Sequence, residues 1–142
     1  MTTYFYGRCS ADENFEKGSS IATQIERANA YAVIHNLKID KEISESISGS
    51  IRFANRPLGL ELMNDLKRDD HIICSALDRF SRNTLDLLQL IEKFKKMKIN
   101  LHFAEFGNVT SSSAMGSVFV KLLSVFAEFY SKQCSEKQSA TK

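Results

Sequence analysis

The stretch TYFYGRCS, residues 3–10, joins a short apolar segment to a polar one. Its first half is β-branched and aromatic, which predicts a buried strand over Thr3–Tyr6. Arg8 and Ser10 follow two positions apart, so their side chains can point to the same side. Ligands of α/β sheets bind beyond the carboxyl ends of the strands. A serine beside an arginine, with no histidine close to it in the sequence, favours chemistry on a phosphate over acyl transfer.

Alternating strand and helix patterns follow this stretch and predict an α/β fold. Strands are indicated at 37–43, 71–74 and 99–104, helices at 20–36, 57–66 and 83–98, and polar loops at 10–17, 44–55 and 107–113. Right-handed crossovers would arrange these elements as a central, mostly parallel sheet of four to five strands flanked by helices. In the first helix, helical spacing assigns the buried face to Ile21, Ile25, Ala28, Ala32 and either Val33 or His35.

The composition is that of one soluble globular domain. The chain has 142 residues, of which 43% are hydrophobic and 25% charged, and a formal net charge of +2. It has no apolar run of about 18 residues, and its N-terminus lacks the regions of a signal peptide. Cys9, Cys74 and Cys134 are odd in number and far apart, which argues against a disulfide framework and favours the cytoplasm. With so small a net charge, phosphate contacts must come from local arginine clusters.

Several common catalytic patterns are missing from the sequence. Ser10 lacks G-x-S-x-G surroundings and a histidine in a triad arrangement, and no P-loop or G-x-G-x-x-G motif occurs. His35, His71 and His102 lack metal-ligand spacing, so we expect them to be structural or solvated.

Arginines supply the positive signal. In the stretch LDRFSR, Arg79 and Arg82 stand three positions apart at a predicted helix start, so both can face one site. A guanidinium keeps its charge and offers a planar fork to phosphate oxygens. Asp78 beside them could orient an arginine or move a proton. Alone, this pattern also suits a helix cap with surface ion pairs, but together with Arg8 and Ser10 it indicates a phosphate site.

Five segments, taken in order, make the chain resemble the catalytic domain of the serine recombinases, the resolvase/invertase family of site-specific DNA recombinases. The resemblance covers residues 4–129. It rests on YGRCS at 6–10, a glutamine at 24, SG at 48–49 followed by RPL at 56–58, LDRFSR at 77–82, and SSAMG at 112–116. Each segment is weak alone, whereas all five with matching spacing are specific.

The resemblance implies a mechanism and a site. Ser10 would attack a phosphodiester of double-stranded DNA, form a 5′-phosphoserine and release a 3′-hydroxyl. Asp78 would assist proton transfer or hold an arginine, while Gln24 and Glu45 would support the site. The resemblance implies no metal or other cofactor, because the phosphoserine bond keeps the energy for religation. Phosphate binding and transition-state stabilisation would come from four arginines, Arg8, Arg56, Arg79 and Arg82.

The resemblance also implies assembly on DNA, as a homodimer that forms a tetramer. A last helix, with Ser113 as a suitable cap, is apolar on more sides than one narrow stripe. Either the domain wraps around it or a second copy packs on it. Its apolar positions are Met115, Val118, Phe119, Leu122, Leu123, Val125, Phe126, Phe129 and Tyr130. We therefore expect a catalytic α/β domain over 1–112, a continuous dimerisation helix over 113–142, and no DNA-binding domain.

Two other functions remain as alternatives. Where active family members carry a Glu-Arg pair late in the long helix, this chain has Tyr130 and Ser131. That departure suggests a catalytically impaired relative that dimerises and regulates a full-length recombinase. A phosphate-binding α/β domain acting on a small molecule is the other alternative, and the lack of nucleotide motifs disfavours it.

Overall fold

The computed structural model describes residues 1–9, 20–48, 51–81, 84–110, 116–126 and 128, and the side chain of Asp78 is outside this description. Within these residues, five strands form one sheet in the order β2-β1-β3-β4-β5. β1 to β4 run parallel, and β5 is antiparallel to β4. The predicted α/β class and mostly parallel sheet are confirmed. The strands are β1 (Thr3–Cys9), β2 (Lys41–Ser46), β3 (His71–Cys74), β4 (Asn100–Phe103) and β5 (Gly107–Asn108).

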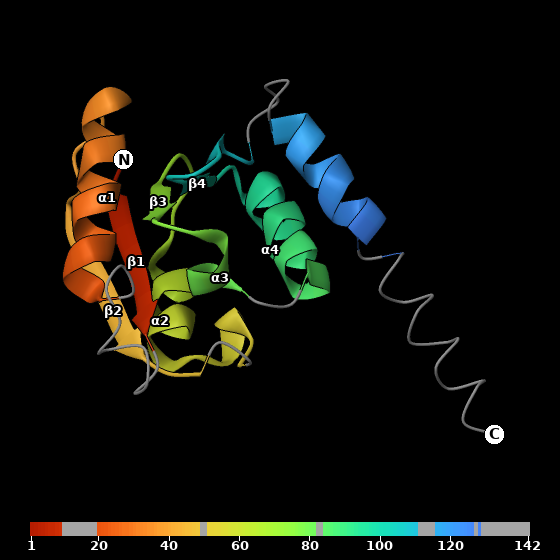
Figure 1. The fold of residues 1–142 in the computed structure, drawn as a ribbon, viewed down its shortest axis with the longest axis horizontal. Helices are drawn as coiled ribbons and strands as arrows, with labels where there is room; N and C mark the ends of the chain where they lie inside the picture. The colour runs from red at the N-terminus through yellow and green to blue at the C-terminus, as the bar shows by residue number, and fades with distance from the viewer. Residues whose placement is uncertain (10–19, 49–50, 82–83, 111–115, 127, 129–142) are drawn as a thin grey trace.

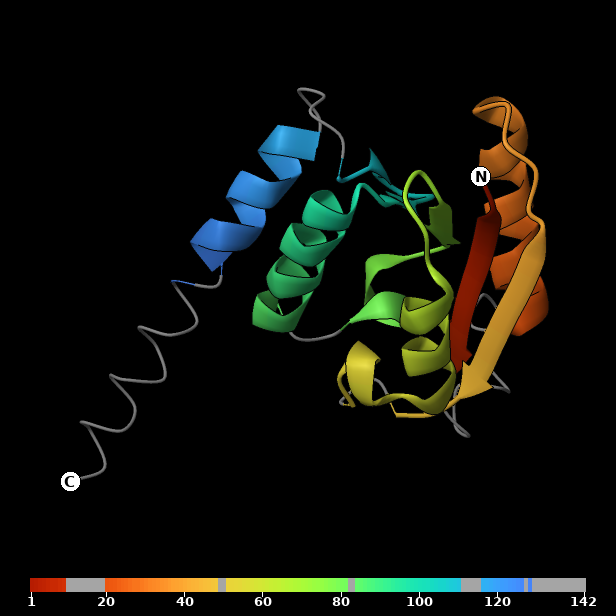
Figure 2. The same cartoon turned by 180° about the vertical axis from the view of Figure 1, so that it is seen from behind.

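Helices cover both faces of the sheet, as Figures 1 and 2 show from opposite sides. Successive strand residues point to opposite faces, so Tyr4 and Tyr6 join one apolar cluster and Phe5 joins the other. The Phe5 cluster is closed by α1, and the larger cluster by α2 and α4. The helices are α1 (Ile21–Ile34), the 3-10 turn η2 (Phe53–Asn55), α2 (Pro57–Asp65), the short α3 (Leu77–Phe80) and α4 (Thr84–Met97).

The helix starts agree with the sequence patterns where the structure describes them. The Ser20 hydroxyl caps α1 by accepting from the Thr23 N–H at 3.2 Å. Pro57 occupies the first turn of α2, where no partner for its nitrogen is needed. The inner face of α4 is buried, with Leu87, Ile91 and Phe94 in the core.

The predicted buried face of α1 was wrong at its end. Val33 and His35 are exposed, whereas Gln24 and Tyr31 are buried with Ala28 and Ala32. The buried positions follow helical spacing, but two of them carry polar groups. A hydrophobic pattern does not identify buried polar residues such as these, because their burial becomes favourable only through a partner that is distant in the sequence.

One strand prediction and one loop prediction also needed correction. The strand predicted at 37–43 lies at Lys41–Ser46, so the predicted loop over 44–55 begins inside β2 and contains η2. Leu37 and Ile39, whose apolar side chains suggested a strand, pack against the cluster under α1 instead. The predicted polar loop over 107–113 begins with β5, because Gly107 and Asn108 pair with Phe103 and His102.

The last described helical segment covers residues 116–126 and lies beside α4 (Figures 1 and 2). Phe119 and Leu123 are buried and belong to the main core cluster, and the Phe119 ring lies 4.9 Å from that of Phe106. The predicted cap Ser113 is outside the described residues. Every helix in the described part of the chain is too short or too polar to cross a membrane.

Two histidines form a hydrogen-bonded chain with a tyrosine on the α1 side of the sheet. His71 Nδ1 lies 2.8 Å from His102 Nε2, and His102 Nδ1 lies 2.7 Å from the Tyr31 hydroxyl. His102 is only 5% exposed, and burial lowers its pKa to about 3. His35 is exposed and its ring lies 4.1 Å from that of Tyr31. The histidines are therefore structural or solvated, as expected.

Candidate active site

Arg8 lies inside β1 rather than beyond its end. The predicted strand stopped at Tyr6, but pairing with β2 continues to Arg8 opposite Glu45 and Cys9 opposite Ser46. Gly7 is of a residue type that is unfavourable in strands. Parallel pairing with β2 overrides this preference, so the strand continues through it. The Arg8 side chain is fully buried and donates from Nη1 to the Ile47 carbonyl oxygen at 3.0 Å.

Gln24 of α1 holds the backbone of Arg8. Its Oε1 accepts from the Arg8 N–H at 3.2 Å, and its Nε2 donates to the Arg8 carbonyl at 3.0 Å. One carboxamide therefore binds both backbone groups, as a neighbouring strand would. The contact requires a glycine at position 7, because a Cβ there would lie 3.0 Å from Gln24 Oε1 and 2.7 Å from the Phe5 ring.

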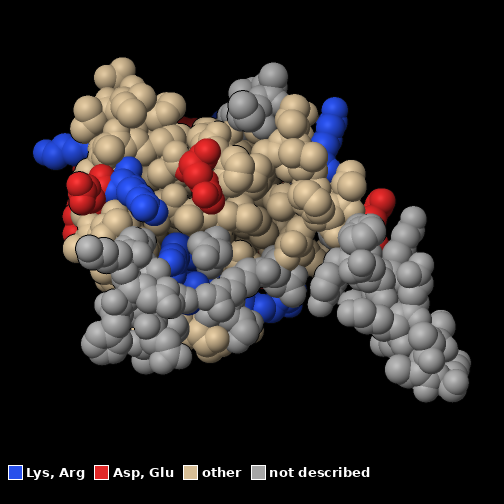
Figure 3. Space-filling model, in the orientation of Figure 1, with Lys and Arg blue, Asp and Glu red and all other residues tan. Residues whose placement is uncertain are grey.

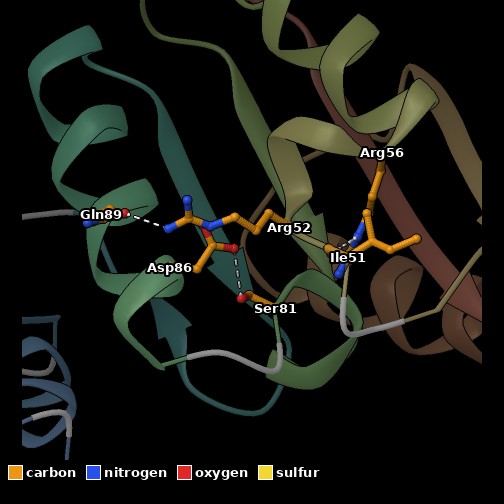
Figure 4. Close-up of polar contacts among 6 residues, drawn as sticks. All are labelled: Ile51, Arg52, Arg56, Ser81, Asp86 and Gln89. Carbon is orange, nitrogen blue, oxygen red and sulfur yellow. Dashed lines mark hydrogen bonds and ion pairs between the residues drawn. The ribbon is translucent and has the colours of Figure 1, made fainter. Parts of the chain in front are cut away.

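Arg56, the N-cap residue of α2, is fully buried and bonded at both ends of its guanidinium. Its Nε donates to the Ile51 carbonyl at 2.9 Å (Figure 4). Its Nη1 donates to the Tyr6 hydroxyl at 3.2 Å and to the Arg79 carbonyl at 3.0 Å. These bonds fix the plane of the guanidinium before any ligand binds.

Glu45 links Tyr6 to the start of α2. The Tyr6 hydroxyl donates to Glu45 Oε2 at 2.6 Å, and the carboxylate accepts from the N–H groups of Leu58 at 3.3 Å and Gly59 at 3.1 Å. A carboxylate is favourable at a helix N-terminus, where N–H groups lack helical partners. Burial and then the bond to Glu45 raise the pKa of Tyr6. The phenol therefore stays protonated while it accepts from Arg56.

Tyr6 was missed as a site residue by the sequence reasoning, although it opens the segment YGRCS. Its aromatic ring was assigned only to the core, where it does lie, 4.9 Å from the ring of Phe53. The hydroxyl adds a second role that a hydrophobic pattern does not indicate. The available signal was a tyrosine two positions from Arg8, on the same side of the strand.

Arg79 is the third predicted site arginine that the structure describes. It lies in α3, is 9% exposed, and directs Nη1 to the Arg8 carbonyl at 3.4 Å. Its own carbonyl accepts from Arg56. Arg8, Arg56 and Arg79 come from three separate segments and are joined directly by hydrogen bonds. The other predicted site residues, Ser10, Arg82 and the Asp78 side chain, are outside the described part of the chain.

Figure 3 shows Lys and Arg side chains bordering the grey atoms on the lower part of one face. No group of three or more His, Cys, Asp or Glu side chains suited to a metal ion occurs among the described residues.

A protein-family model matches almost the whole chain. The profile described as "Resolvase, N terminal domain" matches residues 3–142. The chain belongs to the resolvase family. The predicted resemblance to serine recombinases is thereby confirmed, and the YGRCS and LDRFSR segments fall within the matched region.

Individual resolvases agree with this assignment. The chain is 30% identical to the Transposon Tn2501 resolvase of Escherichia coli over 107 residues, covering 75% of this chain and 55% of the relative. It is 30% identical to the Transposon Tn917 resolvase of Enterococcus faecalis over 123 residues, covering 87% and 59%. The chain thus spans little more than half the length of these two resolvases.

Solved structures of recombinases share the fold. The N-terminal catalytic domain of TP901-1 integrase superimposes with a TM-score of 0.76 at 30% identity, covering 94% of this chain and 98% of that domain. A resolvase family site-specific recombinase from Streptococcus pneumoniae superimposes with a TM-score of 0.65 at 24% identity, which shows the fold alone, over 100% of this chain and 99% of that one.

Proposed function

We propose that this chain is the catalytic domain of a site-specific DNA recombinase in which Ser10 is the nucleophile. The observation that supports this most is the hydrogen-bonded set of Arg8, Arg56 and Arg79 near the carboxyl end of β1. Ser10 follows Arg8 by two residues. Arginines fixed before the reaction stabilise the charge that develops on a phosphoryl group, usually the largest single contribution to catalysis.

The proposed chemistry conserves the number of phosphoester bonds. Ser10 Oγ attacks a DNA phosphorus, an O–P bond to the serine forms, and the bond to the 3′ oxygen breaks. The released 3′ oxygen takes a proton from water and becomes a hydroxyl, and the Ser10 proton passes to Asp78 or through it to water. Arg82 acts with the three described arginines on the phosphate, and Gln24 and Glu45 hold the site. The reverse attack by a 3′-hydroxyl reseals the DNA.

We further propose that the chain acts in the cytoplasm as a dimer that assembles to a tetramer on DNA. The supporting observation is an apolar surface on the helical segment 116–126. Large apolar side chains are rarely left together on a monomer surface. The exposed fractions are 52% for Val118 and Leu122, 60% for Val125 and 59% for Phe126. A division between a catalytic domain over 1–112 and a dimerisation helix over 113–142 stays a prediction.

The nucleophile can be tested by trapping the covalent intermediate. The full-length protein is incubated with a supercoiled plasmid library of genomic fragments from its source, and protein–DNA adducts that survive denaturation are captured and sequenced. The parent should give adducts at defined sites, and Ser10→Ala should give none. Ser44→Ala is a matched control, because this exposed serine of β2 points away from the side of Glu45.

Two outcomes would separate the alternatives. Adducts with the Ser10→Ala protein would show that Ser10 is not the nucleophile. A parent protein that dimerises in sedimentation yet yields no adduct with any fragment would favour the regulatory relative.

A further inference from the structure

Asp86 in the first turn of α4 joins the two segments that carry Arg56 and Arg79. Its Oδ2 accepts from the Ser81 hydroxyl at 3.1 Å, and its Oδ1 lies 3.4 Å from Nε of Arg52 (Figure 4). Ser81 is the C-cap residue of α3, the helix that holds Arg79. Arg52 is the N-cap residue of η2, which leads directly to Arg56. One carboxylate therefore touches both segments.

The same two segments are joined at two further levels. Phe53, next to Arg52, stacks on Phe80, next to Ser81, with ring centroids 4.2 Å apart at 27°. Beyond this stack, Arg56 donates to the Arg79 carbonyl at 3.0 Å. The Asp86 bridge, the aromatic stack and the arginine contact follow one another along both segments. Movement at the bridge would therefore be carried toward the arginines.

The bridge is suited to hold α3 in place. α3 has only four residues, and so short a helix has almost no stability without tertiary anchors. The Asp86 side chain is 9% exposed, compared with 54% for Arg52. A carboxylate this buried is favourable only when it is hydrogen-bonded, and a hydrogen bond to a charged acceptor contributes more than one to a neutral acceptor.

We propose that the bridge from Arg52 through Asp86 to Ser81 positions Arg56 and Arg79 for the phosphate. The inference rests on the proposed function, and it assigns Asp86 as a positioning residue that does not touch DNA. A misplacement of about 1 Å at a reacting centre can lower a rate by roughly 100-fold. Loss of the bridge should therefore lower the rate of serine attack more than the affinity for DNA.

The first test measures the position of Arg56 without using activity. Hydrogen exchange of the Arg56 Nε–H, which donates to Ile51, is followed by NMR in the parent and in Asp86→Ala. We expect exchange at least about tenfold faster in the variant, since a guanidinium released from its place loses this bond. The backbone amides of Ile72 and Ile73 in β3 report global stability. An equal acceleration at Arg56 and in β3 would show a merely structural role and overturn the proposal.

The second test separates the rate from binding in the full-length protein. Asp86→Ala should form the covalent adduct about tenfold more slowly at saturating plasmid, while the plasmid concentration for half saturation changes less than about twofold. Asp86→Asn, which keeps an acceptor for Ser81, should lie between. Gln89→Ala is the matched control, because it removes the other contact of Arg52, at 3.1 Å, and leaves Asp86 in place.

The two tests fail in different ways. A parent protein without any adduct contradicts the proposed function, and the exchange measurement then still decides whether Asp86 positions Arg56. Equal adduct rates in the parent and Asp86→Ala, with normal folding, would overturn the positioning role alone.

Discussion

The buried histidine chain predicts that the domain loses stability below pH 6.5. His102 lies between His71 and Tyr31, and all three groups are satisfied when neutral if the Tyr31 hydroxyl donates to His102 Nδ1 and His102 Nε2–H donates to His71. Burial, followed by repulsion from His71 and His35, lowers the pKa of His102 from 6.5 to about 3. Burial also lowers the pKa of His71, against the opposing charges of Asp70 and Asp69.

The sign follows from proton binding. In the unfolded chain His102 takes a proton as the pH falls through 6.5, whereas in the folded protein it stays neutral until about pH 3. Between these values the unfolded state binds more protons, so the free energy of unfolding decreases as the pH falls. Each pH unit costs about 1.4 kcal/mol, so His102 alone should remove about 2 kcal/mol at pH 5. That is a large part of the ~5–15 kcal/mol typical of a domain.

Urea unfolding at pH 7.5 and pH 5, at one fixed protein concentration, measures this loss. The parent should lose about 2 kcal/mol more between the two pH values than His102→Gln, which cannot titrate. Val33→Gln is the control, because Val33 is an exposed residue of α1 that does not titrate, so its replacement should leave the loss as in the parent. If His102→Gln loses as much stability as the parent, the reasoning is wrong.

Two further substitutions test the packing around the arginines by their effect on the free energy of unfolding in urea. Gly59→Ala should destabilise the domain by about 2 kcal/mol or more, because the added Cβ would lie 2.4 Å from the Phe53 carbonyl oxygen. This loss is expected even though alanine normally favours a helix over glycine. A variant more stable than the parent would contradict the contact. Gln24→Leu should cost about 2–4 kcal/mol, because it leaves the buried N–H and carbonyl of Arg8 without the carboxamide. Asn29→Leu, at an exposed position of the same helix, should change stability by less than about 0.5 kcal/mol, and equal values for the two leucine variants would refute the role of Gln24.

The sequence was informative where short-range patterns decide the structure. Ser20 and Pro57 mark helix starts because a cap and a first turn depend on neighbours within a few residues. It was less informative for β2, which is an edge strand of polar residues, since strand preference depends on what covers each face. Tyr6 and Asp86 were not singled out by the sequence patterns. Their partners, Glu45 and Arg56 for Tyr6 and Arg52 for Asp86, are distant in the sequence and come close only in the folded chain.

The sequence by itself determined the alternation of strands and helices and the resolvase family, and it supplied the prediction that four arginines act with Ser10. Only the tertiary structure decided how the arginines are held. Arg56 donates to Tyr6, which is 50 positions away in the sequence, and to Arg79, which is 23 positions away. Arg79 in turn donates to Arg8, which is 71 positions away. Hydrogen bonds over such separations leave no periodic trace in the chain. They form because the parallel sheet brings strand ends together, and because buried polar groups must then find partners among the elements that arrive there.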